Sequence, residues 1–284
     1  MDITAKDLAA QISELVTFPD VAIKISEAIA DDNVTLESVS FLIETDPALS
    51  AALLRLANSP TFNVGGTIES VQKAAIVVGL KGLRDLAFAI SATHAFDGVC
   101  NDLITVEDFW KHSIYCACAT QIVAQQANVC RGESLFTMGM LHDIGQLVMY
   151  SQCPEKSMEA ILHSQDNNDG LSMYESEREI FGFDHMEVGA ELAATWGFPQ
   201  RLINAIAHHH DPYASEESFD TCIVVHAANS IAVLAELGSD SLYDAPPIDP
   251  QAREFLKLDD AAITKIVGMV KDQVEGMMFM FGGS

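Results

Sequence analysis

Residues 136–150 read FTMGMLHDIGQLVMY, and this stretch indicates both the fold class and a place where chemistry could occur. Its apolar side chains recur at helical spacing, so the sequence predicts one helix, rich in Leu and Met, over residues 134–150. His142 and Asp143 stand inside that apolar helix, where burying an imidazole and a carboxylate costs free energy unless something satisfies them. The pair therefore needs partners from other parts of the chain.

Helical spacing continues on both sides of this stretch. Thr35 can cap a helix, and Asp46-Pro47 is typical of a helix start because Asp accepts free N–H groups there. Further helices are predicted over 68–76, 80–90, 105–129, 184–196 and 222–237. The chain shows neither strand alternation nor a hairpin turn signal, so we predict an all-α, multi-helix bundle.

The charge balance argues against two classes of partner. The 284 residues hold 15 Lys+Arg against 41 Asp+Glu, a formal net charge of −26. Clustered Lys and Arg hold nucleic acids and anionic membranes, so we expect no nucleic acid and no membrane as partners. Six cysteines without a C-x-x-C motif are typical of reduced core thiols. The N-terminus lacks the pattern of a signal peptide, and we expect a cytoplasmic protein.

Histidine is the informative residue type, because phosphate-loop, dinucleotide-loop and H-E-x-x-H motifs are all missing. Neighbouring predicted helices supply His112, His185 and the triplet His208, His209 and His210. Asp108 precedes His112 by four positions and shares its helix face. Imidazole and carboxylate ligands suit Fe, Mn, Co, Ni or Zn, and bundles build metal sites from several inward-facing helices. The alternative is that His142 and Asp143 only form hydrogen bonds with each other and with the backbone.

Six segments, in this order, resemble the HDOD domain from about Leu15 to Pro212. They are DPALSAALLRLANSPTF (46–62), IESVQKAAIVVGLKGLRDL (68–86), FWKHS (109–113), LHDIGQL (141–147), FGFDHMEVGAELAATWGFP (181–199) and AIAHHHDP (205–212). HDOD domains resemble HD-superfamily metal-dependent phosphohydrolases, including HD-GYP phosphodiesterases, and are regarded as bacterial signalling modules. The resemblance implies an HD-type fold with N-terminal helices over 1–100, followed by an HD-like bundle with C-terminal helices over 101–284.

The resemblance also implies a ligand set for a divalent metal such as Fe, Mn, Ni or Zn. Its members are His112, His142, Asp143, His185, His209 and His210, with Asp108, His208 and Asn229 as additional positions. Two positions depart from the HD pattern. Asn229 stands where a final aspartate is expected, and Gln146 stands where a basic residue is often found. A neutral amide is a weaker ligand than a carboxylate, and the loss of a cation weakens phosphate binding.

Two hypotheses about function follow. The first is a regulatory HDOD module that binds a separate signalling protein or a small phosphorylated ligand, has a degenerate HD-type site and has no assigned catalytic residue. The alternative is a metal-dependent phosphohydrolase, a phosphodiesterase or nucleotide hydrolase using the His/Asp metal centre. A third hypothesis is that the protein is a metal or haem-like sensor. The apolar run KIVGMVKDQVEGMMFMF (265–281) could pack within the chain or across a homodimer.

Overall fold

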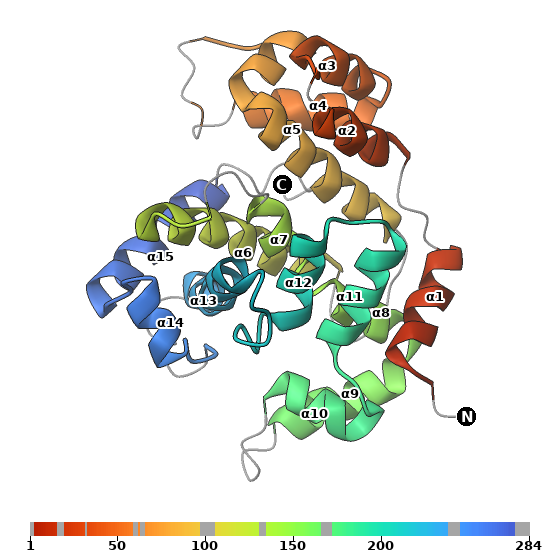
Figure 1. Cartoon of the computed structure of the whole chain (residues 1–284), viewed down its shortest axis with the longest axis vertical. Coiled ribbons are helices and arrows are strands. Elements are labelled where there is room, and N and C mark those ends of the chain that lie inside the picture. Colours follow the sequence, from red (N-terminus) through yellow and green to blue (C-terminus); the bar gives the residue numbers. More distant parts are fainter. Residues whose placement is uncertain are drawn as a thin grey trace.

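The computed structural model describes residues 3–15, 20–31, 33–58, 62, 66–96, 106–130, 135–165, 172–237 and 245–275. Every regular element in these ranges is an α helix, which confirms the all-α prediction (Figure 1). The helices are α1 (Ala5–Leu15), α2 (Asp20–Ala30), α3 (Leu36–Glu44), α4 (Pro47–Ala57), α5 (Val71–Ala95), α6 (Val106–Ala127), α7 (Leu135–Leu141), α8 (Ile144–Gln152), α9 (Pro154–Gln165), α10 (Met173–Phe181), α11 (His185–Thr195), α12 (Gln200–His208), α13 (Phe219–Leu237), α14 (Pro250–Phe255) and α15 (Asp260–Glu275).

Local sequence signals set several of these boundaries as predicted. The Thr35 side chain accepts a hydrogen bond from the Ser38 backbone and caps α3, and the Asp46 carboxylate accepts bonds from two backbone N–H groups of α4. Helix α5 contains a break at Gly79, where φ is 74° and ψ is 163°. The two helices predicted on either side of residue 79 are therefore present, joined at that glycine because it adopts a positive φ readily.

Helices α2 to α5 pack together in the upper part of the molecule in Figure 1. Helix α1 lies away from them and packs against α11 and α8 in the lower part. The N-terminal helix thus contributes to the part of the fold that carries the later helices. The division of the chain near residue 100 stays a prediction.

Helix α13 is the central helix of the lower part and packs against α6, α7, α12, α14 and α15. It is long and apolar enough to cross a membrane, but most of that apolar stretch is buried inside the protein. Packing by five other helices makes α13 a core helix of this part of the protein. The start of α6 at Val106 agrees with the long helix predicted over 105–129.

The helix predicted over residues 134–150 is wrong in one respect. The chain forms α7 and α8 with a turn between them, and His142 and Asp143 occupy that turn. The apolar pattern continues through the turn because both helices are buried, so periodicity alone could not locate the break. Because both residues lie in the turn and not within a helix, their side chains lie between α6 and α11.

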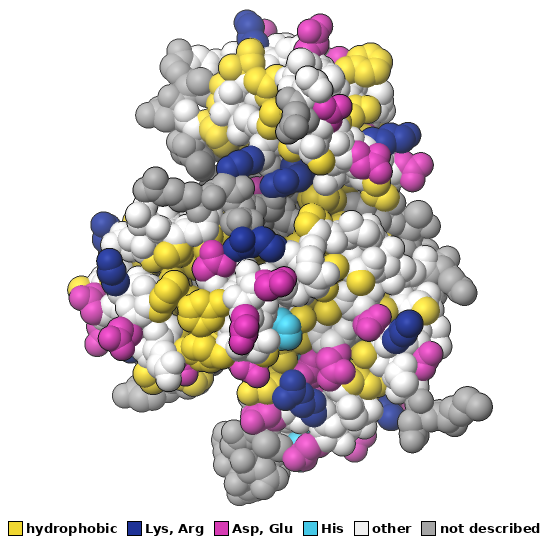
Figure 2. All heavy atoms as spheres, viewed as in Figure 1, with side chains coloured by type: hydrophobic (Ala, Val, Ile, Leu, Met, Phe, Trp, Pro, Cys, Tyr) yellow, Lys and Arg dark blue, Asp and Glu magenta, His cyan; other side chains and the backbone are white. Residues whose placement is uncertain are grey.

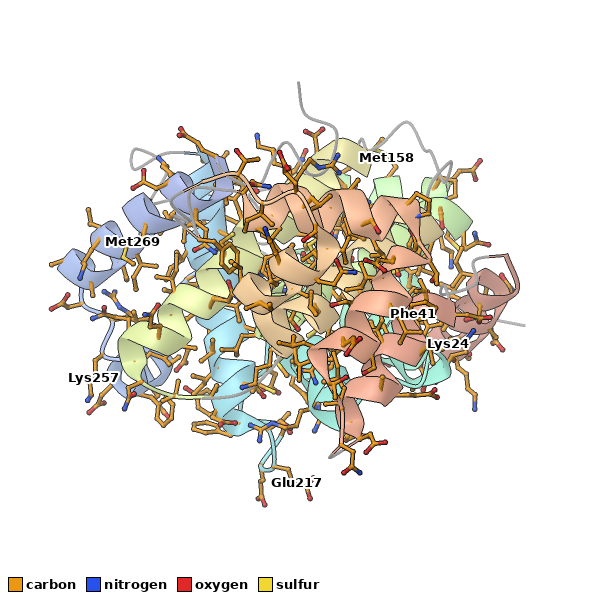
Figure 3. The ribbon with its side chains drawn as sticks, turned by 90° about the horizontal axis from the view of Figure 1, so that it is seen from above. Lys24, Phe41, Met158, Glu217, Lys257 and Met269 are labelled. Carbon is orange, nitrogen blue, oxygen red and sulfur yellow. The ribbon has the colours of Figure 1, made fainter. Side chains whose placement is uncertain are left out.

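The surface carries the negative charge that the composition predicts. In Figure 2, acidic side chains are spread over the visible face among apolar ones, with fewer Lys and Arg. Figure 3 shows Phe41, Met158 and Met269 directed away from the core, with exposed fractions of 66%, 38% and 41%. Of the five cysteines among the described residues, four are buried and Cys153 is partly exposed, and none of these five is in a disulfide bond; Cys100 lies outside the described residues. The predicted apolar run at 265–281 is described as far as Glu275, within α15.

Candidate metal centre

Two glycines bring the His142-Asp143 turn close to its neighbours. A Cβ at Gly139 would lie 2.6 Å from the Cys116 carbonyl oxygen on α6. A Cβ at Gly145 would lie 1.9 Å from the His185 carbonyl oxygen on α11. Both contacts are shorter than any side chain allows, so α7 packs on α6 and α8 packs on α11 with backbones nearly touching. The turn between α7 and α8 is thereby placed between His112 on α6 and His185 on α11.

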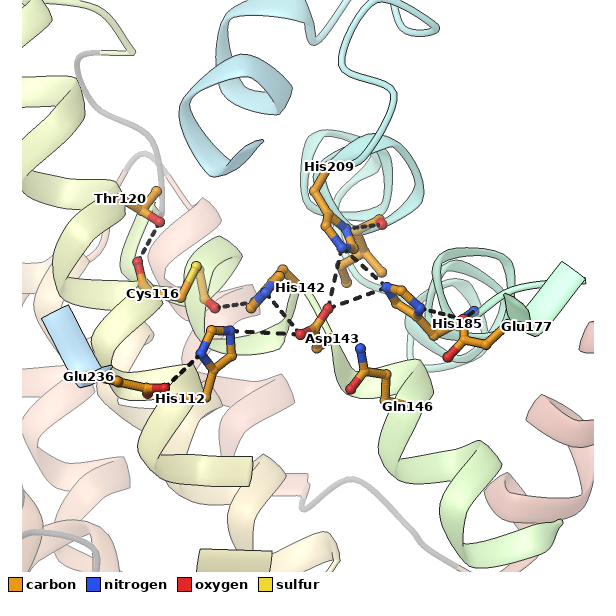
Figure 4. Close-up of polar contacts among 12 residues, drawn as sticks. His112, Cys116, Thr120, His142, Asp143, Gln146, Glu177, His185, His209 and Glu236 are labelled. Carbon is orange, nitrogen blue, oxygen red and sulfur yellow. Dashed lines mark hydrogen bonds and ion pairs between the residues drawn. The ribbon is translucent and has the colours of Figure 1, made fainter. Parts of the chain in front are cut away.

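Asp143 is the centre of the cluster that results (Figure 4). Its Oδ2 atom lies 3.1 Å from Nε2 of His142 and 3.8 Å from Nε2 of His112. Its Oδ1 atom lies 3.4 Å from Nε2 of His185 and 3.3 Å from Nε2 of His209. Four imidazoles from α6, the α7–α8 turn, α11 and the end of α12 thus present the same nitrogen to one carboxylate.

Backbone carbonyls fix the orientation of two of these imidazoles. His142 Nδ1 lies 2.8 Å from the Gly139 carbonyl oxygen, and His209 Nδ1 lies 2.9 Å from the Ile206 carbonyl oxygen. A carbonyl oxygen can only accept, so Nδ1 of each ring carries a proton and donates it. In the neutral ring, Nε2 then has a lone pair directed at Asp143.

Two carboxylates orient the other imidazoles in the same way. Glu177 Oε2 lies 2.6 Å from His185 Nδ1 and also accepts the His185 backbone N–H at 2.9 Å. Glu236 Oε2 lies 3.4 Å from His112 Nδ1. A histidine whose outer nitrogen donates to a carboxylate or carbonyl while its inner nitrogen faces a shared point is the arrangement of metal-binding histidines.

Buried atoms without a hydrogen-bond partner indicate whether a cation would fit in the cluster. His142 Nε2 and Asp143 Oδ1 are buried and have no hydrogen-bond partner. Ligand atoms come together in two groups that share Asp143: His112 and His142 form one group with it, while His185, His209 and His210 form the other. Lone pairs of several imidazoles facing a carboxylate repel one another unless protons or a cation lie between them. The donor set therefore fits one or two divalent cations of the kinds that bind imidazole and carboxylate together.

The charges inside the cluster show what a cation would replace. Burial alone would raise the pKa of Asp143, but the charge of His142 and the nearby imidazoles of His185 and His209 hold that pKa well below its usual value. Burial opposes protonation of His185, yet the Glu177 and Asp143 carboxylates raise its pKa to about 10. Burial lowers the pKa of His209 to about 4. Without a cation, histidine protons balance the Asp143 charge, and a bound cation would displace them.

Most of the cluster is closed to solvent. The side chains of His142, His185 and His209 are fully buried, and Asp143 is 6% exposed. His112 and Glu236 retain about a fifth of their side-chain surface, at 20% and 19%. A molecule in solution can therefore reach His112 and the partly exposed His210, whereas the three fully buried histidines face only protein.

The remaining predicted positions lie in different surroundings. His210 joins the ligand group of Asp143, and its ring stacks on Tyr174 with centroids 4.7 Å apart. Asp108 is exposed on α6 and His208 is partly exposed at the end of α12, and neither joins either ligand group. Asn229 is buried on α13. Gln146 lies beside Asp143 in Figure 4, and its side-chain oxygen accepts the Tyr150 hydroxyl at 3.1 Å.

Glu177 and Glu236 are the site residues that the sequence reasoning missed. Each stands in an apolar helical pattern, Glu177 on one face with Met173 and Ile180, and Glu236 near the end of the apolar helix α13. A carboxylate on the buried face of a helix is costly unless it is paired. The sequence shows this signal as a carboxylate within an apolar pattern. The structure shows that the cost is largest for Glu177, whose side chain is 1% exposed.

The profile of the HDOD domain family matches residues 15–212. The chain belongs to this family. Solved structures confirm the fold of this HDOD protein: an HDOD domain protein from Geobacter sulfurreducens has a TM-score of 0.74 at 23% identity, with 96% of each chain covered. A candidate phosphohydrolase from Shewanella amazonensis SB2B has a TM-score of 0.73 at 24% identity, covering 97% of this chain and 98% of that chain.

Curated relatives match only part of their own length. An uncharacterized protein from Treponema pallidum (strain Nichols) is 26% identical over 215 residues, which are 75% of this HDOD chain and 41% of the relative. Ribonuclease Y from Deinococcus radiodurans is 30% identical over 122 residues, which are 43% of this chain and 16% of that protein. The HDOD chain thus spans less than half the length of either relative.

Proposed function

We propose that this HDOD protein is a cytoplasmic signalling module whose Asp143 centre binds one or two divalent cations. In this proposal it regulates a separate protein by binding it, or by binding a small phosphorylated ligand, without turnover. The observation that carries the proposal is a set of four Nε2 atoms directed at one carboxylate, three of them on fully buried rings, with each ring held from behind by an acceptor. Buried polar atoms in proteins almost always have a partner, so unpaired ones at this centre indicate a place for a bound ion.

The surroundings of the centre favour binding over hydrolysis. Three of the ligand histidines are fully buried, so a phosphodiester would meet mainly the partly exposed His112 and His210. Asn229 and Gln146 are neutral at positions where the HD resemblance implies a carboxylate and a cation. Tyr150 donates to the Gln146 oxygen, which leaves the Gln146 NH2 group as a neutral donor beside Asp143. One neutral donor suits a weakly held oxyanion rather than a stabilised transition state.

Metal content tests this proposal directly. Tag-free protein should contain close to one or two equivalents of Fe, Mn, Ni or Zn by elemental analysis. His142→Ala should lose most of that metal, because it removes an inner nitrogen from the group shared with His112. His163→Ala is the matched control, since His163 lies on α9 outside both ligand groups, with its ring nitrogens near Ser176 and Glu179. Less than about a tenth of an equivalent after reconstitution, or unchanged metal in His142→Ala, would contradict the proposal.

A metal-dependent phosphohydrolase is the second candidate, and one observation favours it. The two oxygens of Asp143 face different ligand groups, so a single carboxylate could hold two cations, as hydrolytic two-metal sites do. Bound there, divalent cations would supply Lewis acid chemistry toward a phosphoryl oxygen. The name of the relative Ribonuclease Y places phosphodiesters of RNA among the substrates to test.

Turnover separates the two candidates. Metal-loaded wild type and Asn229→Asp should be compared with a chromogenic phosphodiester and a short RNA, each with and without chelator. The binding module predicts no chelator-sensitive hydrolysis by the wild type. Chelator-sensitive hydrolysis that increases in Asn229→Asp, where a carboxylate is restored, would favour the phosphohydrolase.

A further inference from the structure

His226 is a half-buried histidine on α13 that no ligand group includes, yet it contacts one ligand histidine directly. Its Nδ1 lies 2.9 Å from the carbonyl oxygen of His209, and its Nε2 accepts the Asp249 backbone N–H at 3.1 Å. A neutral imidazole has one donor and one acceptor, so Nδ1–H donates to His209 while Nε2 accepts from Asp249. The ring is thus fully used in joining two segments.

The segment on the far side of His226 is the start of α14. The Asp249 carboxylate accepts the backbone N–H groups of Gln251 at 2.8 Å and Ala252 at 3.1 Å, and caps the helix. The same carboxylate accepts the hydroxyl of Tyr213, which follows His209 by four residues. These hydrogen bonds therefore link three segments: the loop that follows His209 and His210, helix α13 and the first turn of α14.

Aromatic rings also pack between the loop after His209 and helix α14. The Tyr213 ring lies 5.8 Å from the Phe219 ring, and Phe219 lies 5.3 Å from Phe255 on α14. Aromatic pairs at these separations stabilise the fold beyond the apolar area that they bury. Helix α14 is thus packed against the loop after His209 by both polar and apolar contacts. His226 and Asp249 lie beyond residues 15–212, so both are outside the part of the chain that the family profile matches.

We propose that His226 is a positioning residue for the His209–His210 ligand pair and that it couples cation binding to the docking of α14. The inference rests on the proposed metal binding. His209 presents Nε2 to Asp143 at 3.3 Å while His226 holds its carbonyl oxygen. Loss of His226 leaves the His209 carbonyl and the Asp249 N–H without these partners, which loosens the end of α12 and the start of α14 together. Because coupling between two sites is reciprocal, a protein that displaces α14 weakens cation binding, and a bound cation holds α14 in place.

A Co²⁺ titration of the tag-free full chain tests the positioning role. The visible absorption of Co²⁺ reports both affinity and ligand geometry. His226→Leu removes both hydrogen bonds, and we expect it to weaken Co²⁺ binding about 10- to 100-fold and to change the spectrum, as outer-shell substitutions do. His226→Gln keeps one donor and one acceptor and should restore part of the affinity. His163→Leu makes the same change at a histidine outside both ligand groups, near Ser176 and Glu179, and should match the wild type.

Hydrogen exchange of α14 amides tests the coupling. In the wild type, Co²⁺ should slow exchange over 251–256, and in His226→Leu it should not. Tyr213→Phe keeps the ring contacts and removes only the hydroxyl, so it should reduce this response without changing the fold measured by circular dichroism. Unchanged affinity and spectrum in folded His226→Leu, or an unchanged α14 response, would overturn the inference while leaving metal binding intact. If the wild type itself bound no Co²⁺, the proposed function would fail first, and the inference with it.

Discussion

Gly145→Ala should separate the two helices that hold the centre together. The added Cβ would lie 1.9 Å from the His185 carbonyl oxygen, 2.6 Å from the Gly189 nitrogen and 2.9 Å from the His185 carbonyl carbon. Ordinary contact begins at 3.4 Å, so α8 and α11 must move apart by about 1.5 Å. All three atoms belong to the backbone of α11, and no side-chain rotation can relieve the overlap.

The magnitude follows from the rigidity of that contact. Overpacking a core costs about 1–3 kcal/mol, and a clash with backbone belongs at the upper end. A loss of about 3 kcal/mol lowers the melting temperature of a domain of this size by about 6–12 °C. Ligand groups must be held within about 0.5 Å of their working geometry, so a 1.5 Å shift of His185 relative to Asp143 should weaken divalent cation binding at least about tenfold.

Thermal unfolding followed by circular dichroism measures the first effect, with chelator present so that metal loss does not contribute. Gly268→Ala is the matched control, because a Cβ at this position in α15 meets nothing within 4 Å. That substitution should stabilise the protein by about 0.5–1 kcal/mol through helix propensity. A Gly145→Ala protein that melts within about 1 °C of the wild type and binds cations as tightly would refute the close approach of α8 and α11.

Two further predictions concern an outer carboxylate and a helix cap. Glu177→Gln should weaken divalent cation binding about 10- to 100-fold, because it removes the charge that orients His185, whereas Glu179→Gln on the exposed face of α10 should leave the affinity measured by Co²⁺ titration unchanged. Asp46→Ala should lower the free energy of unfolding by about 1 kcal/mol in denaturant titrations, because the Ala48 and Leu49 N–H groups lose their acceptor; Asp46→Asn keeps an acceptor, and an equal loss in both variants would argue against capping.

The sequence by itself determined the helical class and many of the helix boundaries. These depend on interactions within a few residues, such as the Asp46-Pro47 start, the Asp184 cap of α11 and the break at Gly79. Apolar residues at helical spacing predict which face of a helix is buried, and that face can be recognised without knowing what covers it. The candidate ligands were also recognisable, because histidines and a buried carboxylate are costly in apolar helices.

Tertiary structure alone decided how those residues meet. Asp143 became the shared centre because the chain turns between α7 and α8, and continuous apolar periodicity conceals that turn. Glu177 and His226 gained their roles from helices that approach from distant parts of the sequence. Approach distances such as that at Gly145 depend on side-chain volume at both surfaces of a contact. Local patterns record one surface at a time, so the convergence of α6, α8, α11 and α12 on one carboxylate could be seen only in the folded protein.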